Sequence, residues 1–227
     1  MRFFYILNNM TTNLSNNYSL ISEYMYELRD KTVQQDKQKF RLNIERIGEL
    51  IAYEISKEIK SKEHEVETVL GSKNINIIAN QPVIASIMRA GIPLHNGILR
   101  MFDKADNAFI SAYRKHNELD ENDFRILVEY LSCPPLDDRI LIVADPMLAT
   151  GASLVACIKE LLKYGKPSKI HVVSVLATYE GIENVKKNFD NVSIWCGDID
   201  DELTAKSYIV PGLGDAGDLC YGEKIQS

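Results

Sequence analysis

The feature of this sequence that most constrains its fold is the alternation of short apolar runs with stretches of helical periodicity. Apolar runs at residues 82–88, 108–112, 139–144, 169–177 and 191–196 have the length of buried strands. Helical stretches follow three of these runs, at residues 91–102, 152–164 and 181–188. Because strands that alternate with helices form a parallel sheet, we predict an α/β fold with helices on both faces of that sheet.

A further helix is predicted at residues 36–60, before the first of these strands. Apolar residues recur there at spacings of three and four, which is typical of an amphipathic helix. The apolar stripe consists of Phe40, Ile44, Ile47, Ile51 and Ile55. We expect this stripe to face the core or a second subunit.

The remaining segments predict appendages to one domain that spans residues 1–227. Polar residues separate 108–112 from a β-like stretch at 123–131, which predicts a protruding, flexible β-arm over 108–131. Residues 1–35 are predicted to form an N-terminal arm, in which the polar, Asn-rich stretch Asn8–Ser19 is expected to be loose. Residues 197–227 are rich in Gly and Asp, and we expect them to form an irregular cap on the sheet.

Charge and composition argue against several broad classes of protein. The net charge of −6 and pI of about 5.3 give no basic field, so no nucleic-acid partner is expected. The sequence contains no run of about 18 apolar residues, so no membrane partner is expected. We interpret the four widely spaced cysteines as free thiols in a reducing, cytoplasmic setting. They are Cys133, Cys157, Cys196 and Cys220.

The stretch Leu141–Leu154, LIVADPMLATGASL, places an acid and a hydroxyl-bearing loop between a strand and a helix. Ligands of open α/β sheets bind beyond the carboxyl ends of the strands, where Asp145 would lie. The loop from Ala149 to Ser153 enters a helix, and unpaired amides at a helix start attract anions. The sequence therefore predicts a phosphate site. The alternative is a plain strand–loop–helix joint capped by Ser153.

Two arginines lie near the ends of predicted strands. Arg89 follows the strand at 82–88 in the segment SIMRAG, and Arg114 lies in SAYR at the base of the predicted arm. A guanidinium can donate two parallel hydrogen bonds to a diphosphate. The alternatives are a structural ion pair for Arg89 and a solvated surface position for Arg114.

The segment Tyr208–Asp218, YIVPGLGDAGD, carries three glycines and the acids Asp215 and Asp218. Glycines allow positive φ, so this backbone can fold tightly around a ligand. The glycines are Gly212, Gly214 and Gly217. Backbone N–H and C=O groups can form a rigid complement to the edge of a planar base. A series of turns that binds nothing is the alternative.

The motifs RAG, YR, DPMLATG and PGLGDAGD occur here in the order found in uracil phosphoribosyltransferases, and the chain resembles that family of type I phosphoribosyltransferases from about residue 40 onward. The resemblance implies the family's fold, with a β-arm and a C-terminal cap or hood. It implies a reaction of uracil with 5-phosphoribosyl diphosphate (PRPP) that gives uridine monophosphate (UMP) and diphosphate. It also implies Mg²⁺ that arrives with PRPP rather than at a protein metal site, a homodimer or higher homo-oligomer, and a purine-nucleotide effector.

The resemblance also assigns roles to residues. The catalytic residues would be Arg89, Arg114, Asp145 and Asp215. PRPP would be bound by Arg89, Arg114, Asp145, Pro146, Met147, Leu148, Ala149, Thr150, Gly151, Ala152, Ser153 and Asp215. Uracil would be bound, mainly through backbone groups, by Ile209, Gly214, Asp215 and Ala216. No general base of unusual pKa is expected, because backbone acceptors can take the uracil N–H.

Three positions depart from the family pattern. Ala152 stands where a second glycine is usual, Thr204 where an Asn is usual, and Leu219 where a basic residue often follows the last Asp of the cap. If the backbone at Ala152 needed positive φ, alanine would cost about 1–2 kcal/mol. Leu219 offers no ion pair to Asp218. The acidic run DIDDELT, which ends at Thr204, is otherwise interpreted as a solvated turn.

Three alternatives to this enzyme stay open at the level of sequence. The first is a pyrimidine-sensing, RNA-binding regulator, against which the acidic net charge counts. The second is a catalytically silent protein on the same fold. The third is specificity for a different base, against which the pyrimidine-type cap counts. The histidines show no metal-ligand spacing, and His95 is expected to pack within a helix.

Overall fold

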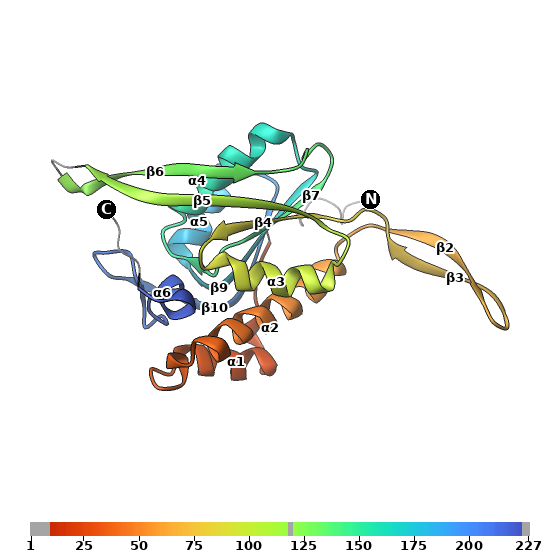
Figure 1. Ribbon diagram of the computed structural model, residues 1–227, viewed down its shortest axis with the longest axis horizontal. Helices are drawn as coiled ribbons and strands as arrows, with labels where there is room; N and C mark the ends of the chain where they lie inside the picture. Colours follow the sequence, from red (N-terminus) through yellow and green to blue (C-terminus); the bar gives the residue numbers. More distant parts are fainter. Residues whose placement is uncertain (1–9, 118–119, 224–227) are drawn as a thin grey trace.

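The computed structural model describes residues 10–117 and 120–223, and the side chains of 113–126 lie outside what it describes. The chain forms a central sheet between two groups of helices (Figure 1). The strands follow the order β1-β10-β9-β7-β4-β5-β6, with β8 paired to β9. Neighbouring strands run parallel, and β6 runs antiparallel to β5. The strands are β1 (Thr11–Asn13), β4 (Val83–Met88), β5 (Asp106–Asn117), β6 (Asp120–Ser132), β7 (Ile140–Ala144), β8 (Met147–Leu148), β9 (Lys169–Thr178) and β10 (Val192–Asp200).

Helices cover both faces of this sheet, as the sequence predicts. Alternate residues of each strand enter different cores, because successive side chains point to opposite faces. Ile84 and Ile142 pack with the first group of helices, whereas Val83 and Leu141 pack with the second. The first group is α1 (Leu20–Arg29), α2 (Lys37–Ser56) and α3 (Gly91–Met101), and the second is α4 (Ala152–Leu161) and α5 (Tyr179–Asn188). The predicted α/β fold class is therefore confirmed.

The apolar stripe of α2 faces the core and not the surface. Phe40 is 1% exposed, and the isoleucines of the stripe are fully buried. Asp36 caps this helix, because its side chain accepts hydrogen bonds from the amides of Gln38 and Lys39. The stripe therefore has no surface left for a subunit contact, and the core interpretation is the right one.

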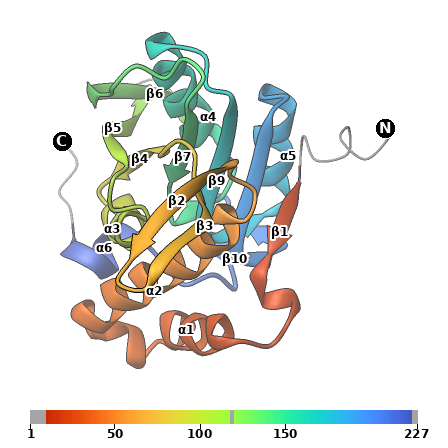
Figure 2. The ribbon, with the colours of Figure 1, turned by 90° about the vertical axis from the view of Figure 1, so that its right-hand side faces the viewer.

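The N-terminal segment is more ordered than the sequence predicts. Thr11–Asn13 pairs with β10 as an edge strand, and the following α1 buries Ile21, Met25 and Leu28 against α2 and the sheet. Figure 2 shows α1 and α2 side by side beneath the sheet. The prediction of a loose segment is wrong for residues 10–19, because Thr11–Asn13 joins the sheet and Ser19 caps the packed helix α1. Residues 8 and 9 lie outside the described part of the chain.

A second hairpin, absent from the predicted elements, protrudes from the molecule. Strands β2 (Ser61–Thr68) and β3 (Gly71–Ile78) pair antiparallel and are exposed along most of their length. Figure 1 shows this hairpin extending from the side of the sheet opposite to the tip of β5 and β6. At its turn, Val69 is 100% and Leu70 98% exposed. Strands β5 and β6 pair across the segment predicted as the β-arm.

The C-terminal cap is irregular over much of its length, as the sequence predicts, but it contains short regular elements. Strand β10 continues to Asp200, and the cap then forms a small two-stranded sheet and a short helix. These elements are β11 (Glu202–Leu203), β12 (Ile209–Val210) and α6 (Ala216–Tyr221). Arg41 of α2 donates a hydrogen bond to the carbonyl of Cys220 at 2.6 Å, and so ties α6 to the body.

Smaller predictions also have clear outcomes. All four cysteines are free, as expected, and burial raises the pKa of Cys157, Cys196 and Cys220 to about 12. His95 is 2% exposed and packs against Phe109, which confirms its packing role. Within residues 10–117 and 120–223, no helix qualifies by length and apolar content as a membrane span. Single-turn 3₁₀ helices occur at Leu14–Asn16, Val33–Gln35 and Leu162–Tyr164.

Candidate active site

The loop between β7 and α4 presents a helix start at the carboxyl end of the sheet. Gly151 is the N-cap of α4, with φ of 75° in the left-handed region. Ser153, the cap of the alternative interpretation, lies inside the first turn of the helix. Because glycine has no side chain to accept from the following amides, these amides can be used by an anion. Thr150 Oγ1 lies 3.4 Å from the amide of Ala152 and adds a hydroxyl to the same place.

Ala152 costs no backbone strain, which answers the question raised by its departure from the family pattern. It is the first residue of α4 and does not adopt positive φ. The loop has its left-handed residue one position earlier, at Gly151. Alanine is a better helix former than glycine, so the helix start is intact with alanine at this position.

Residues of α5 and its N-cap hold the loop between β7 and α4 by hydrogen bonds to its carbonyls. The carbonyl of Ala149 accepts a hydrogen bond from Thr178 Oγ1 at 2.6 Å, and the carbonyl of Thr150 accepts one from Asn184 Nδ2 at 2.8 Å. A Cβ at Gly151 would lie 2.9 Å from the carbonyl oxygen of Gly181. The loop is therefore fixed by residues that the sequence reasoning did not single out, because they come from a different strand–helix unit.

Pro146, Met147 and Leu148 connect Asp145 to the loop. Pro146 and Leu148 are buried, and Met147 is half-buried. The Pro146 carbonyl accepts from the amides of Val175 and Leu176 at 3.0 and 2.9 Å. These residues therefore hold the loop against β9, and the two buried side chains contact protein on all sides.

Asp145 lies half-buried directly after β7. Its amide donates to the Val173 carbonyl at 3.1 Å, and its own carbonyl accepts from Ser174 Oγ at 2.7 Å. Desolvation raises the pKa of the Asp145 carboxyl from 3.8 to about 6, although a hydrogen bond from the Met147 amide lowers it. The sequence does not predict this shift, because it arises from the strands that surround the carboxylate.

Arg89, at the carboxyl end of β4, contacts the cap. Its Nη2 donates to Asp218 Oδ1 at 2.9 Å, and its Nη1 donates to the carbonyl of Gly222 at 3.3 Å. The guanidinium side chain is 39% exposed, so these contacts leave part of it open to solvent. Asp218 thus has an ion pair despite Leu219, because its partner comes from a distant strand and not from the next residue.

Arg114 lies on β5 opposite Ile126 of β6. Its backbone lies part-way along the protruding hairpin, beyond Ser111, where the pairing of β5 with β4 ends, and not at the predicted base. Its side chain lies outside the described residues, so a contact between this arginine and a diphosphate stays a prediction.

Two glycines give the cap loop its shape. Gly212 has φ of 62° and Gly214 has φ of 94°, both in the left-handed region. A Cβ at Gly212 would lie only 2.0 Å from the carbonyl oxygen of Ile209. Gly217 lies in α6 without positive φ, so two of the three glycines in this segment use that region.

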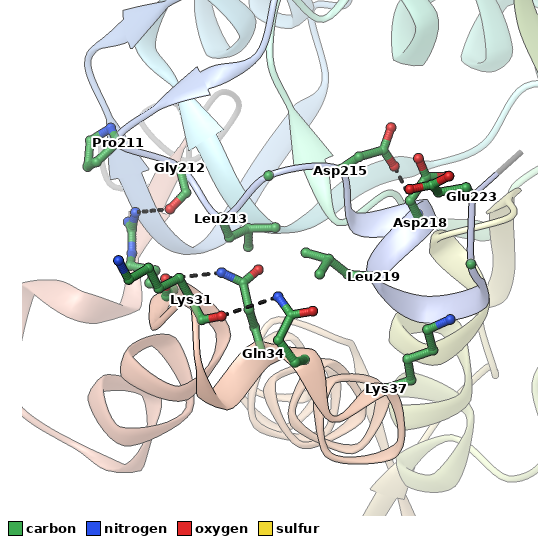
Figure 3. Close-up of a pocket in the computed structure, with 14 residues that line it drawn as sticks. Lys31, Gln34, Lys37, Pro211, Gly212, Leu213, Asp215, Asp218, Leu219 and Glu223 are labelled. Atoms are coloured by element: carbon green, nitrogen blue, oxygen red, sulfur yellow. Dashed lines mark hydrogen bonds between the residues drawn. The ribbon is translucent and has the colours of Figure 1, made fainter.

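The predicted base-binding residues follow one another around this loop. Ile209 is buried on β12, Gly214 is exposed, and Ala216 begins α6. Asp215 is the N-cap of α6, and its Oδ1 accepts from the amide of Asp218 at 3.0 Å. Figure 3 shows Leu213 pointing into the cavity beneath the loop and Asp215 pointing to the other side. The two faces of the loop are therefore chemically different.

The acidic run that leads into the cap is not a solvated turn. Asp198 and Asp200 belong to β10 and form ion pairs with Arg29 at 2.8 and 2.7 Å. Desolvation would lower the pKa of Arg29, but the hydrogen bonds that it donates to Asp200 and Asp198 raise the pKa overall. Thr204, which replaces the usual Asn, accepts from the Tyr208 amide through Oγ1 at 3.1 Å and closes the turn between β11 and β12.

A cavity of about 670 Å³ lies between this loop and the chain that joins α1 to α2 (Figure 3). Basic and amide side chains line one wall, and the cap lines the other. Asp200, which accepts from the Gly212 amide, pairs across β10 and β9 with Thr178, which donates to the Ala149 carbonyl. The cap and the loop between β7 and α4, far apart in sequence, are therefore held at the same end of the sheet.

Known proteins are similar to this chain in sequence and in architecture. The model of the family described as uracil phosphoribosyltransferase matches residues 15–223. A uracil phosphoribosyltransferase of Porphyromonas gingivalis is 46% identical over 209 residues, which cover 92% of this chain and 96% of that protein. One from Pyrococcus furiosus is 39% identical over 91% of this chain and 88% of its own length. The solved structure of the AQ2163 protein from Aquifex aeolicus has a TM-score of 0.83 and 32% identity, and covers 96% of this chain and 100% of that one. The chain therefore belongs to the uracil phosphoribosyltransferase family.

Proposed function

We propose that this chain transfers the 5-phosphoribosyl group of PRPP to uracil in pyrimidine salvage, with UMP and diphosphate as products. The observation that carries the proposal is the contact of Arg89 with the cap. It joins the end of β4 to the glycine-rich loop. Beside β4, the neighbouring strand β7 leads into the phosphate loop. The carboxyl end of the sheet thus carries groups suited to a phosphate, a diphosphate and a base.

The phosphate loop is suited to the 5′-phosphate of PRPP. The amides at the start of α4 would bind the phosphate oxygens, with the hydroxyls of Thr150 and Ser153 as further donors. Asp145, next to this loop, would accept hydrogen bonds from the ribose hydroxyls, directly or through water. Such contacts hold the sugar in the geometry for attack, which lowers the entropic part of the barrier.

The cap is suited to the edge of uracil. The backbone groups of Ile209, Gly214, Asp215 and Ala216 would pair with its two carbonyls and its N–H. The loop is held tightly, so a base with donors and acceptors exchanged would leave buried groups unpaired. Asp215, on the face away from the cavity, would also reach PRPP.

The reaction forms a bond between uracil nitrogen and the anomeric carbon as the bond from that carbon to diphosphate breaks, and the proton of that nitrogen passes to the departing diphosphate or to solvent. Charge develops on the leaving diphosphate, and Arg89 and Arg114 would stabilise it there. Diphosphate charge would be neutralised by Mg²⁺ bound to PRPP. Because Mg²⁺ takes oxygen ligands and keeps several waters, the diphosphate and water would supply most of these ligands. Within residues 10–117 and 120–223, no group of three or more His, Cys, Asp or Glu side chains is placed to hold a metal ion.

The test is a steady-state assay with PRPP, Mg²⁺ and one of three bases. We expect UMP from uracil and at most about 1% of that rate with cytosine or hypoxanthine, because mismatched polar groups cost several kcal/mol. Turnover of another base at the uracil rate would reject the specificity. Uracil binding without turnover would identify a silent protein. A tight gel shift with pyrimidine-leader RNA, without turnover, would identify the regulator.

The predicted homodimer has its strongest support in the β2–β3 hairpin. A lone two-stranded hairpin is marginally stable in water, and this one exposes Val69 and Leu70 fully at its tip. We propose that the hairpin packs on a second copy. The predicted cytoplasmic location and purine-nucleotide effector stay proposals, and the four free thiols support a reducing compartment.

The hairpin proposal predicts a change in molar mass. The double variant Val69→Ser and Leu70→Ser is expected to weaken the dimer at least about 10-fold, because two large apolar side chains lose their buried partner surface. Light scattering across a dilution series measures this. Tyr164→Ser, which removes a 41% exposed aromatic from a different surface, should leave the mass unchanged. A wild type that is monomeric throughout the series rejects the proposal.

A further inference from the structure

We propose that Arg29 is a positioning residue for uracil, because it holds Gly212 and thereby the base-binding backbone of the cap. The residue belongs to α1, and the sequence assigns it no role. The proposal rests on the proposed function of the same site. It concerns how the cap keeps its shape and not which atoms touch the base.

Arg29 and two carboxylates enclose the peptide groups of Gly212. Nη1 of Arg29 donates to Asp200 Oδ2 at 2.7 Å and to the carbonyl of Gly212 at 3.1 Å. Nη2 donates to Asp200 Oδ1 at 2.9 Å and to Asp198 Oδ2 at 2.8 Å. Asp200 Oδ2 also accepts from the amide of Gly212 at 2.9 Å. Both backbone polar groups of Gly212 are therefore bound to one ion-pair network.

Gly212 is a constrained point of the cap backbone, because both of its backbone polar groups are hydrogen-bonded. It has positive φ and lies against the carbonyl of Ile209, so its peptide planes have little freedom. Ile209 and Gly214 flank it, and both are predicted to bind uracil through backbone groups. A rotation at Gly212 would move these two groups relative to each other, and shifts of about 1 Å are enough to weaken a preorganised site.

The network needs a guanidinium on a rigid element. The guanidinium of arginine can donate to Asp200 from two nitrogens and also to the Gly212 carbonyl. The ammonium group of lysine has a single nitrogen and cannot make this planar set of contacts. Leu28, Met25 and Ile21 fix α1 in the core. Without Arg29, the carboxylates of Asp198 and Asp200 would lie close together with no cation between them, and their repulsion would loosen the end of β10.

The experiment compares Arg29→Gln and Arg29→Lys with a matched control. Arg139 also pairs with a carboxylate, Asp106, and a carbonyl, that of Gln81, but at the amino ends of the strands. For Arg29→Gln we expect the KM for uracil to rise about 10-fold or more, with the KM for PRPP within about 2-fold. The KM of Arg29→Lys for uracil should lie between those of wild type and Arg29→Gln. Arg139→Gln should change neither KM.

A second measurement does not depend on turnover. In the ligand-free protein, amide hydrogen exchange of residues 209–217 should accelerate in Arg29→Gln and not in Arg139→Gln, with melting temperature measured for both. Unchanged exchange at 209–217, or an equal rise in both KM values, would overturn the proposal. If wild type does not convert uracil, the proposed function fails by itself, and exchange still decides whether Arg29 holds the cap. If Arg29→Gln does not fold, Arg29→Lys gives the decision on both measurements.

Discussion

Replacing Asp145 with asparagine is expected to stabilise the free protein while it removes most of the activity. The carboxyl has a pKa of about 6 in the folded protein and 3.8 as the ordinary value. Its ionised form is therefore disfavoured by folding, and stability is lost as pH rises from about 4 through 6. Because the residue keeps some contact with solvent, we expect asparagine to add on the order of 1–2 kcal/mol at pH 8.

The same substitution should lower kcat/KM for PRPP roughly 100-fold or more, because a neutral amide replaces the acceptor for the ribose hydroxyls. Thermal melts at pH 8 and pH 3 test the stability part, and the gain should largely vanish at about pH 3, below both pKa values, where the carboxyl is mostly protonated in both states. In wild type, kcat/KM should fall as pH drops through about 6. Full activity of Asp145→Asn, or an equal gain in stability over wild type at both pH values, contradicts the prediction.

Replacing Arg89 with alanine is expected to lower kcat/KM for PRPP about 100- to 1,000-fold. The change removes a diphosphate donor, and it also leaves Asp218 without its 2.9 Å partner next to a polyanionic substrate. Both effects weaken the binding of PRPP. Steady-state kinetics per folded protein, with circular dichroism as the check on folding, measures the loss.

Asp218→Asn separates the two effects. It removes the ion pair with Arg89 but keeps the guanidinium and a side chain of the same size. If Arg89 serves PRPP, this variant should stay within about 5-fold of wild type, and Arg89→Lys should recover only part of the activity, because lysine lacks the fork. Equal losses in Arg89→Ala and Asp218→Asn would mean that the arginine acts only by holding the cap.

Much of the fold could be predicted because its signals are local. Apolar runs and helical spacings report each strand and helix from its own residues. The loop from Asp145 to Ser153 could be located for the same reason. The local signal at Ile21, Met25 and Leu28 was also present, and the polar residues before it obscured it. The β2–β3 hairpin had no such signal, because its exposed strands need no apolar face within this chain.

The sequence by itself determined the order of the main strands and helices from β4 to β10, the glycines that turn the backbone, and the motifs that identify the family. Tertiary structure alone decided which charges meet. Arg29 and Asp200 are 171 residues apart, and Arg89 and Asp218 are 129 apart. It also decided the pKa of Asp145, which depends on the strands that surround it. Backbone preference acts between neighbours in the chain, whereas ion pairing and desolvation act through space, and only the folded sheet defines which groups are close.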